Sequence, residues 1–577
     1  MAPPSLAPLA RHHGLTLSYD DRMVRDDTLR LILDGLRQDP DGPPTGPAAP
    51  LKMKIPDITC PLPARGWGLF CQLYELRSAR NWGIGDFADL SVLAGIAGRA
   101  GADFLGINPV HALFTAAPDR CSPFSPSNRR FLNPLYIAPD LLGCDRPDDL
   151  PDGDLVDYAS VARAKLAALR TAFDGSEDDP DFDAFQATEG RALHLHALYE
   201  TISHDRGGAG WTDWPEALHD PEGDAAQAVG RDRADDVAFH AWLQWVARTQ
   251  LHAAQEAATQ AGMRLGLYLD LAVGEAQDGS ATWSGTAAAL PGLDVGAPPD
   301  VFSEQGQNWH LAAPNPARLR EAGFAPFRAM IEAQLRDAGA LRVDHAMALW
   351  QLFLIPSGRP ASEGTHLRYP FTDMLRVVAE EARRAGATVI GEDLGFVPDG
   401  FRDAMEAANV LSYRIVYFEQ SDDGFTPAPA YPETALACLS THDLPPLAAW
   451  WRGEDIDLRE AHGLVSPEAS AQHRDHREWE RVELTRAFGL PARVADADTL
   501  PDAVRDAAHA FVAATPSRLV AARLADLVGP DRPTNLPGVT DAYPNWRPRG
   551  TVPLEALEDH PTFRATCAAL AARRPRA

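Results

Sequence analysis

The sequence is almost without lysine. Only Lys52, Lys54 and Lys165 occur among its 577 residues, so arginine carries nearly all of the positive charge, which we interpret as a bias of composition. Acidic residues outnumber lysine and arginine together by 81 to 53, which gives a formal net charge of −28. Nucleic acids and anionic membranes attract basic surfaces, so we expect neither as a partner.

Cysteine and long apolar runs are also scarce. The six cysteines are dispersed and form no CxxC pair: they are Cys60, Cys71, Cys121, Cys144, Cys438 and Cys567. This pattern predicts buried, reduced thiols and argues against a disulfide framework or a zinc site. No apolar run is long enough to cross a bilayer, and the first seven residues lack a charged start followed by an apolar segment. We therefore expect a soluble cytoplasmic protein.

Short apolar or β-branched runs alternate with helical segments along most of the chain. Apolar residues make up 45% of the sequence, enough for a large core. The length exceeds one ordinary domain, but a barrel with insertions can absorb most of it. Eight segments are expected to be strands: 66–73, 103–109, 264–270, 340–345, 387–392, 412–418, 435–441 and 517–527. This alternation predicts an α/β fold.

Acidic residues stand at the ends of three of these predicted strands. Asp344 follows Arg342 by two positions, Glu392 and Asp393 end the segment 387–392, and Asp443 follows the segment 435–441. Because side chains alternate across a strand, Arg342 and Asp344 should point the same way. A neighbouring cation keeps a carboxylate ionised, and an ionised carboxylate can act as a nucleophile. Three acidic strand ends fit a site that several barrel strands assemble.

These strand ends resemble a known family. The segments LRVDH at 341–345, IGEDLG at 390–395 and STHDLP at 440–445 are closely similar to the catalytic segments of the 4-α-glucanotransferases, the amylomaltases of glycoside hydrolase family 77. Similar segments nearer the N-terminus lie at 74–86 and 125–135, and the resemblance runs from about residue 60 to 549. It implies a closed (β/α)8 TIM barrel with helical insertions over its C-terminal face and a short N-terminal helical extension.

The resemblance also divides the chain. Residues 1–50 should form the N-terminal helical extension and a linker, and residues 51–577 the catalytic barrel. Insertions are expected at about 145–235, 274–315 and 452–512. The segment 274–315 reads as a long loop, and loops of this length inside a compact domain are usually functional. It is similar to the family loop that covers bound glucan.

The family's chemistry assigns a role to each strand-end carboxylate. Transfer between α-1,4-glucans with retention needs one carboxylate that attacks the anomeric carbon and one acid that protonates the leaving oxygen. The resemblance makes Asp344 the nucleophile and Glu392 the general acid and then base. Asp443 would bind hydroxyls of the reacting sugar. Asp393 faces the opposite side of the strand from Glu392 and is expected to be structural.

Further residues are assigned to substrate binding because of the same resemblance. Sugar rings have apolar faces that stack on aromatic side chains, so the group contains aromatic as well as polar residues. Its members are Arg342, His442, Phe124, Asn108, Asp278, Asp300, Phe302 and Trp309. His111, close to Asn108, reads either as a sugar contact or as a packed structural histidine.

Three positions depart from the usual family pattern. Phe124 replaces a tyrosine, so a ring remains but its hydroxyl is lost. His310 stands where glycine is common, which affects the backbone of its loop. Ala348 occupies a frequent glycine position and is expected to tighten the packing behind the site.

The expected partners are maltooligosaccharides and other α-1,4-glucans, and the chemistry requires no cofactor or metal. Two alternatives remain open. One is a related α-glucan hydrolase or branching enzyme, against which the match over the 296–309 loop argues. The other is a catalytically silent glucan-binding protein, against which the three intact acids argue.

Overall fold

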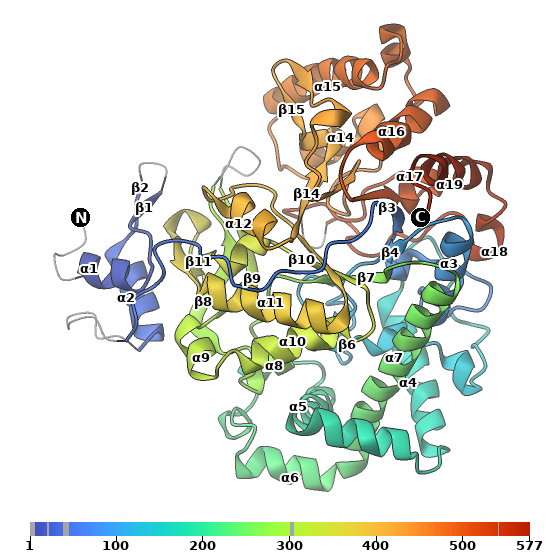
Figure 1. Ribbon diagram of the computed structural model, residues 1–577. Coiled ribbons are helices and arrows are strands. Elements are labelled where there is room, and N and C mark those ends of the chain that lie inside the picture. Colours follow the sequence, from blue (N-terminus) through green and yellow to red (C-terminus); the bar gives the residue numbers. More distant parts are fainter. Residues whose placement is uncertain (1–5, 20–21, 38–45, 300–304, 540–541, 577) are drawn as a thin grey trace.

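The computed structural model describes residues 6–19, 22–37, 46–299, 305–539 and 542–576, and a closed barrel of eight parallel strands lies at its centre (Figure 1). The barrel strands, in order around the barrel, are β10 (Ala340–Val343), β13 (Thr388–Gly391), β14 (Leu411–Ile415), β17 (Ala435–Cys438), β18 (Leu519–Arg523), β3 (Gly66–Phe70), β4 (Phe104–Gly106) and β7 (Gly266–Leu271). The expected TIM barrel is confirmed. Each strand overlaps one of the eight predicted segments.

One predicted strand is too long. The segment 517–527 continues past β18 as helix α17 (Leu524–Val528). Its Ala- and Leu-rich composition suits either structure, and only pairing of β18 with β17 and β3 fixes the strand's length.

Aromatic rings fill the barrel below the site. The ring of Phe70 lies 5.3 Å from that of Tyr268 and 6.0 Å from that of Phe104. The ring of Tyr413 lies 6.5 Å from Phe70, and the guanidinium of Arg342 is 5.6 Å above the centre of the Tyr413 ring. These rings pack together in the barrel interior, and the first charged side chain above them is that of Arg342, which lies over Tyr413.

Helices cover the outside of the barrel and build the regions around its mouth. Those in the barrel wall are α3 (Phe87–Arg99), α7 (Ala234–Gln260), α10 (Ala325–Leu335), α11 (Phe371–Ala385), α12 (Phe401–Ala407), α18 (Leu554–Leu557) and α19 (Pro561–Arg573). Those between β6 (Asn128–Leu132) and α7 are α4 (Tyr158–Asp174), α5 (Pro180–Asp205) and α6 (Asp224–Asp232). Those between β17 and β18 are α13 (Leu447–Arg452), α14 (Glu454–Ala461), α15 (Pro467–Ala487) and α16 (Asp502–Ala514). The second and third groups form lobes at opposite ends of the molecule in Figure 1.

The segment 274–315 is not the open loop that the sequence predicted. It contains the short helix α8 (Ser280–Trp283) and two long strands, β8 (Ala289–Ala297) and β9 (Gln307–Pro314). They belong to a four-stranded sheet with β11 (Gln351–Pro356) and β12 (Thr365–Arg368), in the order β12-β11-β8-β9. The partner strand β11 lies more than fifty residues further along the chain, so local sequence could not reveal the pairing. We call β8 and β9 the hairpin.

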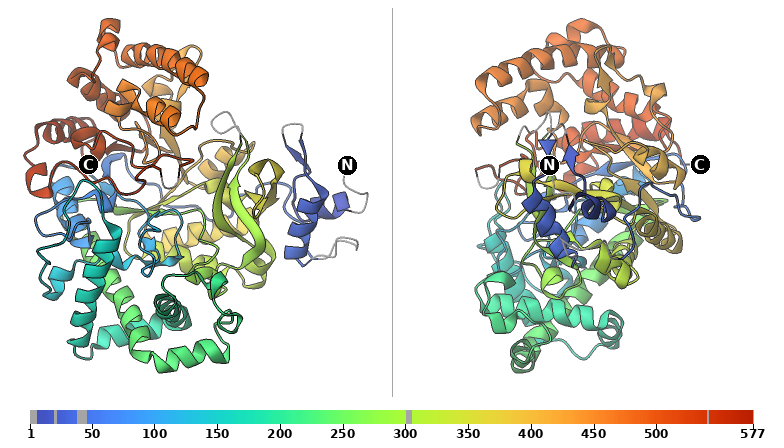
Figure 2. Two further views of the ribbon diagram at one scale, coloured as in Figure 1. Left: turned by 180° about the vertical axis from the view of Figure 1, so that it is seen from behind. Right: turned by 90° about the vertical axis from the view of Figure 1, so that its left-hand side faces the viewer.

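The N-terminal residues lie against this sheet (Figure 2). They form α1 (Leu6–His12), β1 (Ser18–Tyr19), β2 (Arg22–Met23) and the predicted helix α2 (Asp26–Gly35). The backbone N–H of Thr16 donates to the carbonyl of His366, and that of Arg368 donates to the carbonyl of Gly14, at 3.0 and 3.1 Å. The extension therefore covers the outer edge of β12.

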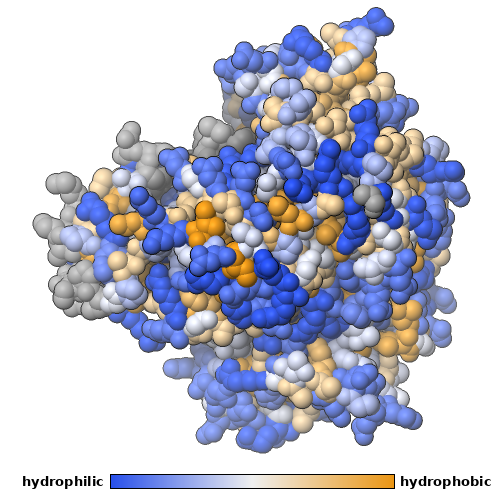
Figure 3. Space-filling model, in the orientation of Figure 1, coloured by the Kyte–Doolittle hydropathy of each residue, from blue (hydrophilic) through white to orange (hydrophobic). Residues whose placement is uncertain are grey.

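Small elements complete the fold: β5 (His111–Ala112), which pairs with β6, the ribbon of β15 (Gln420–Ser421) and β16 (Gly424–Phe425), and α9 (Pro316–Glu321). All six cysteines are free thiols, and all but Cys144 are buried, as predicted. The surface seen in Figure 3 is mostly hydrophilic with scattered apolar patches. Among the described residues, every helix is too short or too polar to span a membrane.

Candidate active site

Arg342 and Asp344 point the same way at the C-terminal end of β10, as the alternation of side chains predicted. The Nη2 of Arg342 lies 2.8 Å from Oδ1 of Asp344. Its Nη1 donates to both oxygens of Asp270, at 2.7 and 2.8 Å. Burial opposes the charge on Arg342, but the two carboxylates outweigh it and raise its pKa. The predicted nucleophile is therefore held beside a permanent cation.

Asp270 is a member of this group that the sequence analysis left without a role. It lies directly opposite Arg342 on the neighbouring parallel strand β7. Burial is the main reason that the pKa of Asp270 is raised to about 6, although Arg342 opposes that shift. The signal was present in the sequence, because Asp270 ends a predicted barrel strand, as Asp344 does, but register between strands is not readable from one sequence.

Glu392 lies just past the end of β13 and is buried. Its Oε2 accepts a hydrogen bond from the backbone N–H of His345 at 2.9 Å, and its Oε1 accepts one from the N–H of Leu394 at 2.7 Å. Burial raises the pKa of Glu392 to about 7, Arg342 opposes this, and the charge of Asp344 adds to it. A carboxyl group that is protonated near neutral pH can act as a general acid.

Asp393 points away from Glu392, as predicted. Its Oδ2 accepts hydrogen bonds from Nε of Arg402 at 2.8 Å and from the hydroxyl of Ser412 at 2.7 Å. Its Oδ1 accepts one from the backbone N–H of Tyr413 at 3.0 Å. These contacts tie β13 to its neighbour β14, which is a structural role.

Asp443, the third predicted acid, lies beyond β17 with a 45% exposed side chain. His442 Nε2 is 3.1 Å from its Oδ2, and Nδ2 of Asn535 donates to its Oδ1 at 2.7 Å. Partial desolvation would raise the pKa of Asp443, but His442 and these hydrogen bonds outweigh it and lower the pKa to about 2. Asp443 therefore stays ionised and can accept hydrogen bonds from hydroxyl groups.

Phe124 lies against His442. Their rings are stacked with centres 4.5 Å apart and an interplanar angle of 18°. Trp546 packs on both, at 5.5 Å from Phe124 and 5.8 Å from His442. The structure thus brings the predicted platform next to a predicted sugar-binding histidine, and it adds Trp546, to which the sequence analysis assigned no role.

A buried polar chain supports the segment that carries His442 and Asp443. Arg523, at the end of β18, donates to the carbonyls of Thr441 and Leu444 at 2.7 and 2.8 Å. It also donates to the hydroxyl of Thr534 at 2.8 Å, which in turn donates to Glu75 at 2.9 Å. Burial raises the pKa of Glu75 despite the nearby Arg523. No signal in the sequence indicates that these distant residues meet.

The hairpin brings Trp309 to the nucleophile strand. The Trp309 ring meets that of His345 edge-on, with centres 5.2 Å apart. The backbone of His310 has φ 55°, in the left-handed region that favours glycine, which explains why glycine is common there. His345 also has a positive φ, 42°, so the two residues flanking this contact both have strained backbones.

Other predicted binding residues do not all reach the site. Asn108 is buried, accepts from the N–H of Leu73 and donates to Tyr136 and Pro109, so its amide is used within the protein and the predicted sugar contact is not supported. His111 is buried too, and burial lowers its pKa to about 3, which fits the packed structural reading. Asp278 pairs with Arg120 at 2.7 Å. Asp300 and Phe302 lie outside the described residues.

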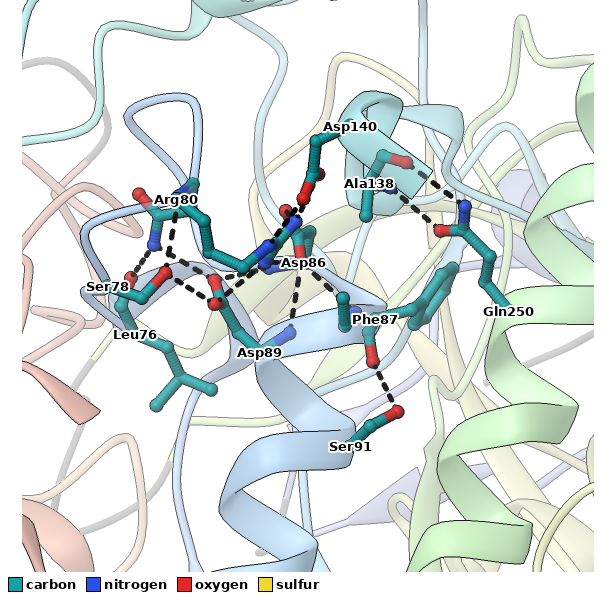
Figure 4. Close-up of polar contacts among 12 residues, drawn as sticks. Leu76, Ser78, Arg80, Asp86, Phe87, Asp89, Ser91, Ala138, Asp140 and Gln250 are labelled. Atoms are coloured by element: carbon teal, nitrogen blue, oxygen red, sulfur yellow. Dashed lines mark hydrogen bonds and ion pairs between the residues drawn. The ribbon is translucent and has the colours of Figure 1, made fainter. Parts of the chain in front are cut away.

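A cluster of buried and partly buried charges fixes the loop between β3 and α3, within the segment 74–86 that carries the resemblance. We call it the Arg80 cluster; it consists of Ser78, Arg80, Asn81, Asp86, Asp89, Asp140 and Lys165. Figure 4 shows Arg80 between three carboxylates, with Nη1 at 2.7 Å from Asp86 and 2.9 Å from Asp89, and Nη2 at 2.6 Å from Asp140. Asp86 also caps helix α3.

A cavity of about 100 Å³ lies behind the nucleophile strand. Its wall includes Val343, Ala348 and Leu349 together with Met330 and Ile331 of α10. The methyl group of Ala348 borders this cavity, where glycine would leave more open space.

Comparison with known proteins decides the family. The model of glycoside hydrolase family 77, described as 4-alpha-glucanotransferase, matches residues 71–553. The chain belongs to the 4-alpha-glucanotransferase family. It is 39% identical over 537 residues to the 4-alpha-glucanotransferase of Mycobacterium tuberculosis, covering 86% of this chain and 72% of that protein. It is 34% identical over 530 residues to that of Haemophilus influenzae, covering 85% and 76%.

Solved structures agree. The amylomaltase from Corynebacterium glutamicum superposes with a TM-score of 0.84 at 28% identity, covering 98% of this chain and 99% of that one. The amylomaltase from Streptococcus agalactiae has the same fold, with a TM-score of 0.73 at 19% identity and coverage of 89% and 99%. The resemblance found in the sequence is thus confirmed, and the chain is an enzyme that transfers α-1,4-glucan segments.

Proposed function

We propose that this 4-alpha-glucanotransferase works by a retaining double displacement in which Asp344 is the nucleophile and Glu392 the acid and base. Asp344 attacks the anomeric carbon of the donor glucan while Glu392 protonates the departing glycosidic oxygen. The departing glucan leaves a glycosyl group on Asp344. Glu392, now ionised, takes the proton of the acceptor's 4-hydroxyl as that oxygen attacks the same carbon.

The other residues bind or orient. Asp443 accepts hydrogen bonds from hydroxyl groups of the reacting sugar, and His442 donates a hydrogen bond to one of them. Phe124 provides an aromatic ring on which the sugar stacks. Arg342 holds Asp344 through a direct ion pair, and Asp270 fixes Arg342 from the other side. Trp309 contributes to the acceptor side of the cleft.

The contrast between Asp344 and Glu392 carries this proposal. The two carboxyl groups follow neighbouring strands that pair in register. One has a direct ion pair with Arg342 at 2.8 Å, whereas the other has two backbone N–H donors and a pKa raised to about 7. A carboxylate in an ion pair and a carboxyl group whose pKa is raised by burial fit a nucleophile and an acid.

Incubation with maltotriose tests the proposal. Glucose together with maltodextrins longer than maltotriose is the result expected for transfer. Glucose and maltose alone would make the protein a hydrolase, and unchanged maltotriose a binding protein. The variant Asp344→Asn should lose turnover roughly 10⁴-fold or more while its circular dichroism spectrum stays unchanged, since the nucleophile contributes little packing. Near-normal turnover in that variant would refute the assignment.

A further inference from the structure

Two phenylalanines in the described part of the chain are more than a third exposed, and both follow adjacent barrel strands. Phe396, 66% exposed, comes after β13, and Phe418, 43% exposed, comes after β14. These strands are parallel neighbours, so their C-terminal ends open onto the same face of the barrel as the site. A single exposed apolar residue is ordinary on a protein surface. Phe396 differs from such a residue because its ring contacts that of His366.

The ring of Phe396 packs on the four-stranded sheet that also carries Trp309. Trp309 contacts His345, and at the other end His366 contacts Phe396, with ring centres 6.2 Å apart and an interplanar angle of 34°. Burial, and to a lesser extent the electrostatic effect of His345, lowers the pKa of His366 to about 4. His366 is therefore neutral at pH 7 and offers Phe396 an uncharged support.

The backbone on both sides of this contact is well anchored. His366 lies on β12, between the ring of Phe353 at 5.0 Å and the N-terminal extension that pairs with its carbonyl. The loop that carries Phe396 starts at Leu394, whose N–H binds Glu392, and turns at Gly395 with φ 78°. A left-handed residue at this point directs the chain outward, and glycine adopts it without strain.

We propose that Phe396 is a stacking platform for the acceptor glucan. This rests on the function proposed above. Glu392 acts on the oxygen where the first glucan departs and the acceptor arrives, so the loop directly after it borders the half of the cleft that those chains share. The exposed ring offers a flat apolar surface that matches the apolar face of a glucose unit.

Its position predicts which glucose unit it touches. Phe396 lies four residues beyond the acid Glu392 and rests on His366 of β12, so it contacts the second or a later unit of the acceptor and leaves the first to residues nearer the acid. Loss of the ring should weaken the binding of long acceptors and leave the binding of glucose as acceptor unchanged.

Acceptor-dependent kinetics with α-maltosyl fluoride as donor test this, because fluoride leaves without help from an acid. Phe396→Ala should raise the KM for maltotriose as acceptor about three- to tenfold, the value of one stacking contact. The KM for glucose as acceptor, and fluoride release without acceptor, should not change. Phe396→Trp should restore the wild-type KM for maltotriose. Val92→Ala is the matched control, because Val92 is 47% exposed on the outer barrel helix α3.

Three results would overturn the proposal. One is an unchanged KM for maltotriose in Phe396→Ala. Another is an equal rise for glucose and maltotriose, because that would mean that the loop acts through Glu392. The third is an equal rise in Val92→Ala. Failure of the proposed function looks different, since the wild-type enzyme would then release fluoride without forming transfer products with any acceptor.

Discussion

The two sides of the barrel mouth are built in different ways. On one side, the loop between β3 and α3 is fixed by the Arg80 cluster, in which one guanidinium meets the two fully buried carboxylates Asp86 and Asp89. On the other side, the hairpin carries Trp309, which is held by a hydrogen bond to Gln307 at 3.2 Å and by its contact with His345. Residues 305–310 of the hairpin are exposed or half-buried.

This difference suggests a division of labour. Ion pairs with buried carboxylates are costly to break, so the loop between β3 and α3 should keep a single conformation. It should thereby hold this side of the barrel mouth in a fixed arrangement. The contacts of Trp309 are few and close to solvent, so they can be changed without loss of the fold. We therefore expect substitutions on the fixed side to change stability and those on the hairpin to change the outcome of the reaction.

The largest effect should come from the fixed side. Arg80→Met leaves the buried carboxylate of Asp89 without its cation and leaves Asp86 the more distant Lys165, at 3.9 Å, and breaking a buried pair in this way typically costs about 3–5 kcal/mol. The free energy of unfolding, measured with urea, should fall by that amount. Arg99→Met is the control, because the side chains of Arg99 and Glu558 are both more than half exposed and solvent screens their ion pair, so the loss should be much smaller. Equal losses in the two variants would remove the distinction between the two sides.

The second effect concerns Glu392. This buried carboxyl group accepts hydrogen bonds from backbone N–H groups, whereas Asp86 and Asp89 pair with the guanidinium of Arg80. Its pKa is raised from an ordinary value of 4.5 to about 7, chiefly by burial and then by Asp344. Between these values the native protein holds the proton more tightly than the unfolded chain does, so stability falls as pH rises from 4.5 to 7. Glu392→Gln cannot ionise and should escape this loss.

The measurement is the melting temperature of both proteins across that range. The amide changes the hydrogen bonds with His345 and Leu394 by an amount that does not depend on pH, so the slope is the readout. The difference, variant minus wild type, should grow from pH 4.5 to 7 and stay level above. A difference that is constant with pH would mean that Glu392 is not a neutral acid in the folded enzyme.

The same contrast explains what the sequence could reveal. The eight barrel strands and the strand-end acids were predictable, because short apolar runs and residue alternation are local properties, and the Arg342–Asp344 pair confirms the alternation. The pairing of the hairpin into a four-stranded sheet was not predictable, because its partner β11 is remote in the chain. Asp270 and the Arg523 chain were missed for the same reason, since they depend on register between strands.

The hairpin should control the outcome of the reaction. Once Asp344 carries a glycosyl group, water and the acceptor's 4-hydroxyl compete for the same carbon, and transfer wins only if the acceptor is positioned, which is worth several kcal/mol. Trp309→Ala should therefore raise the ratio of hydrolysis to transfer about tenfold, while fluoride release from α-maltosyl fluoride changes less. If both rates fell together with an unchanged ratio, the hairpin would serve general binding. The free energy of unfolding should stay close to that of the wild type.

The smallest effect is expected at Phe124, where a family tyrosine is replaced. Its ring is stacked on His442 at 4.5 Å and touches Trp546, so the neighbours already fix its position, and Phe124→Tyr adds only a hydroxyl at the ring edge. One hydrogen bond is worth about 0.5–1.5 kcal/mol, so kcat/KM should change by about tenfold at most. Phe124→Leu, which removes the stack on His442, should lower kcat/KM more than Phe124→Tyr changes it. A hundredfold change in kcat/KM for Phe124→Tyr would show that Phe124 does more than provide a ring for stacking. It would also mean that this part of the barrel mouth is held less rigidly than the loop that the Arg80 cluster fixes.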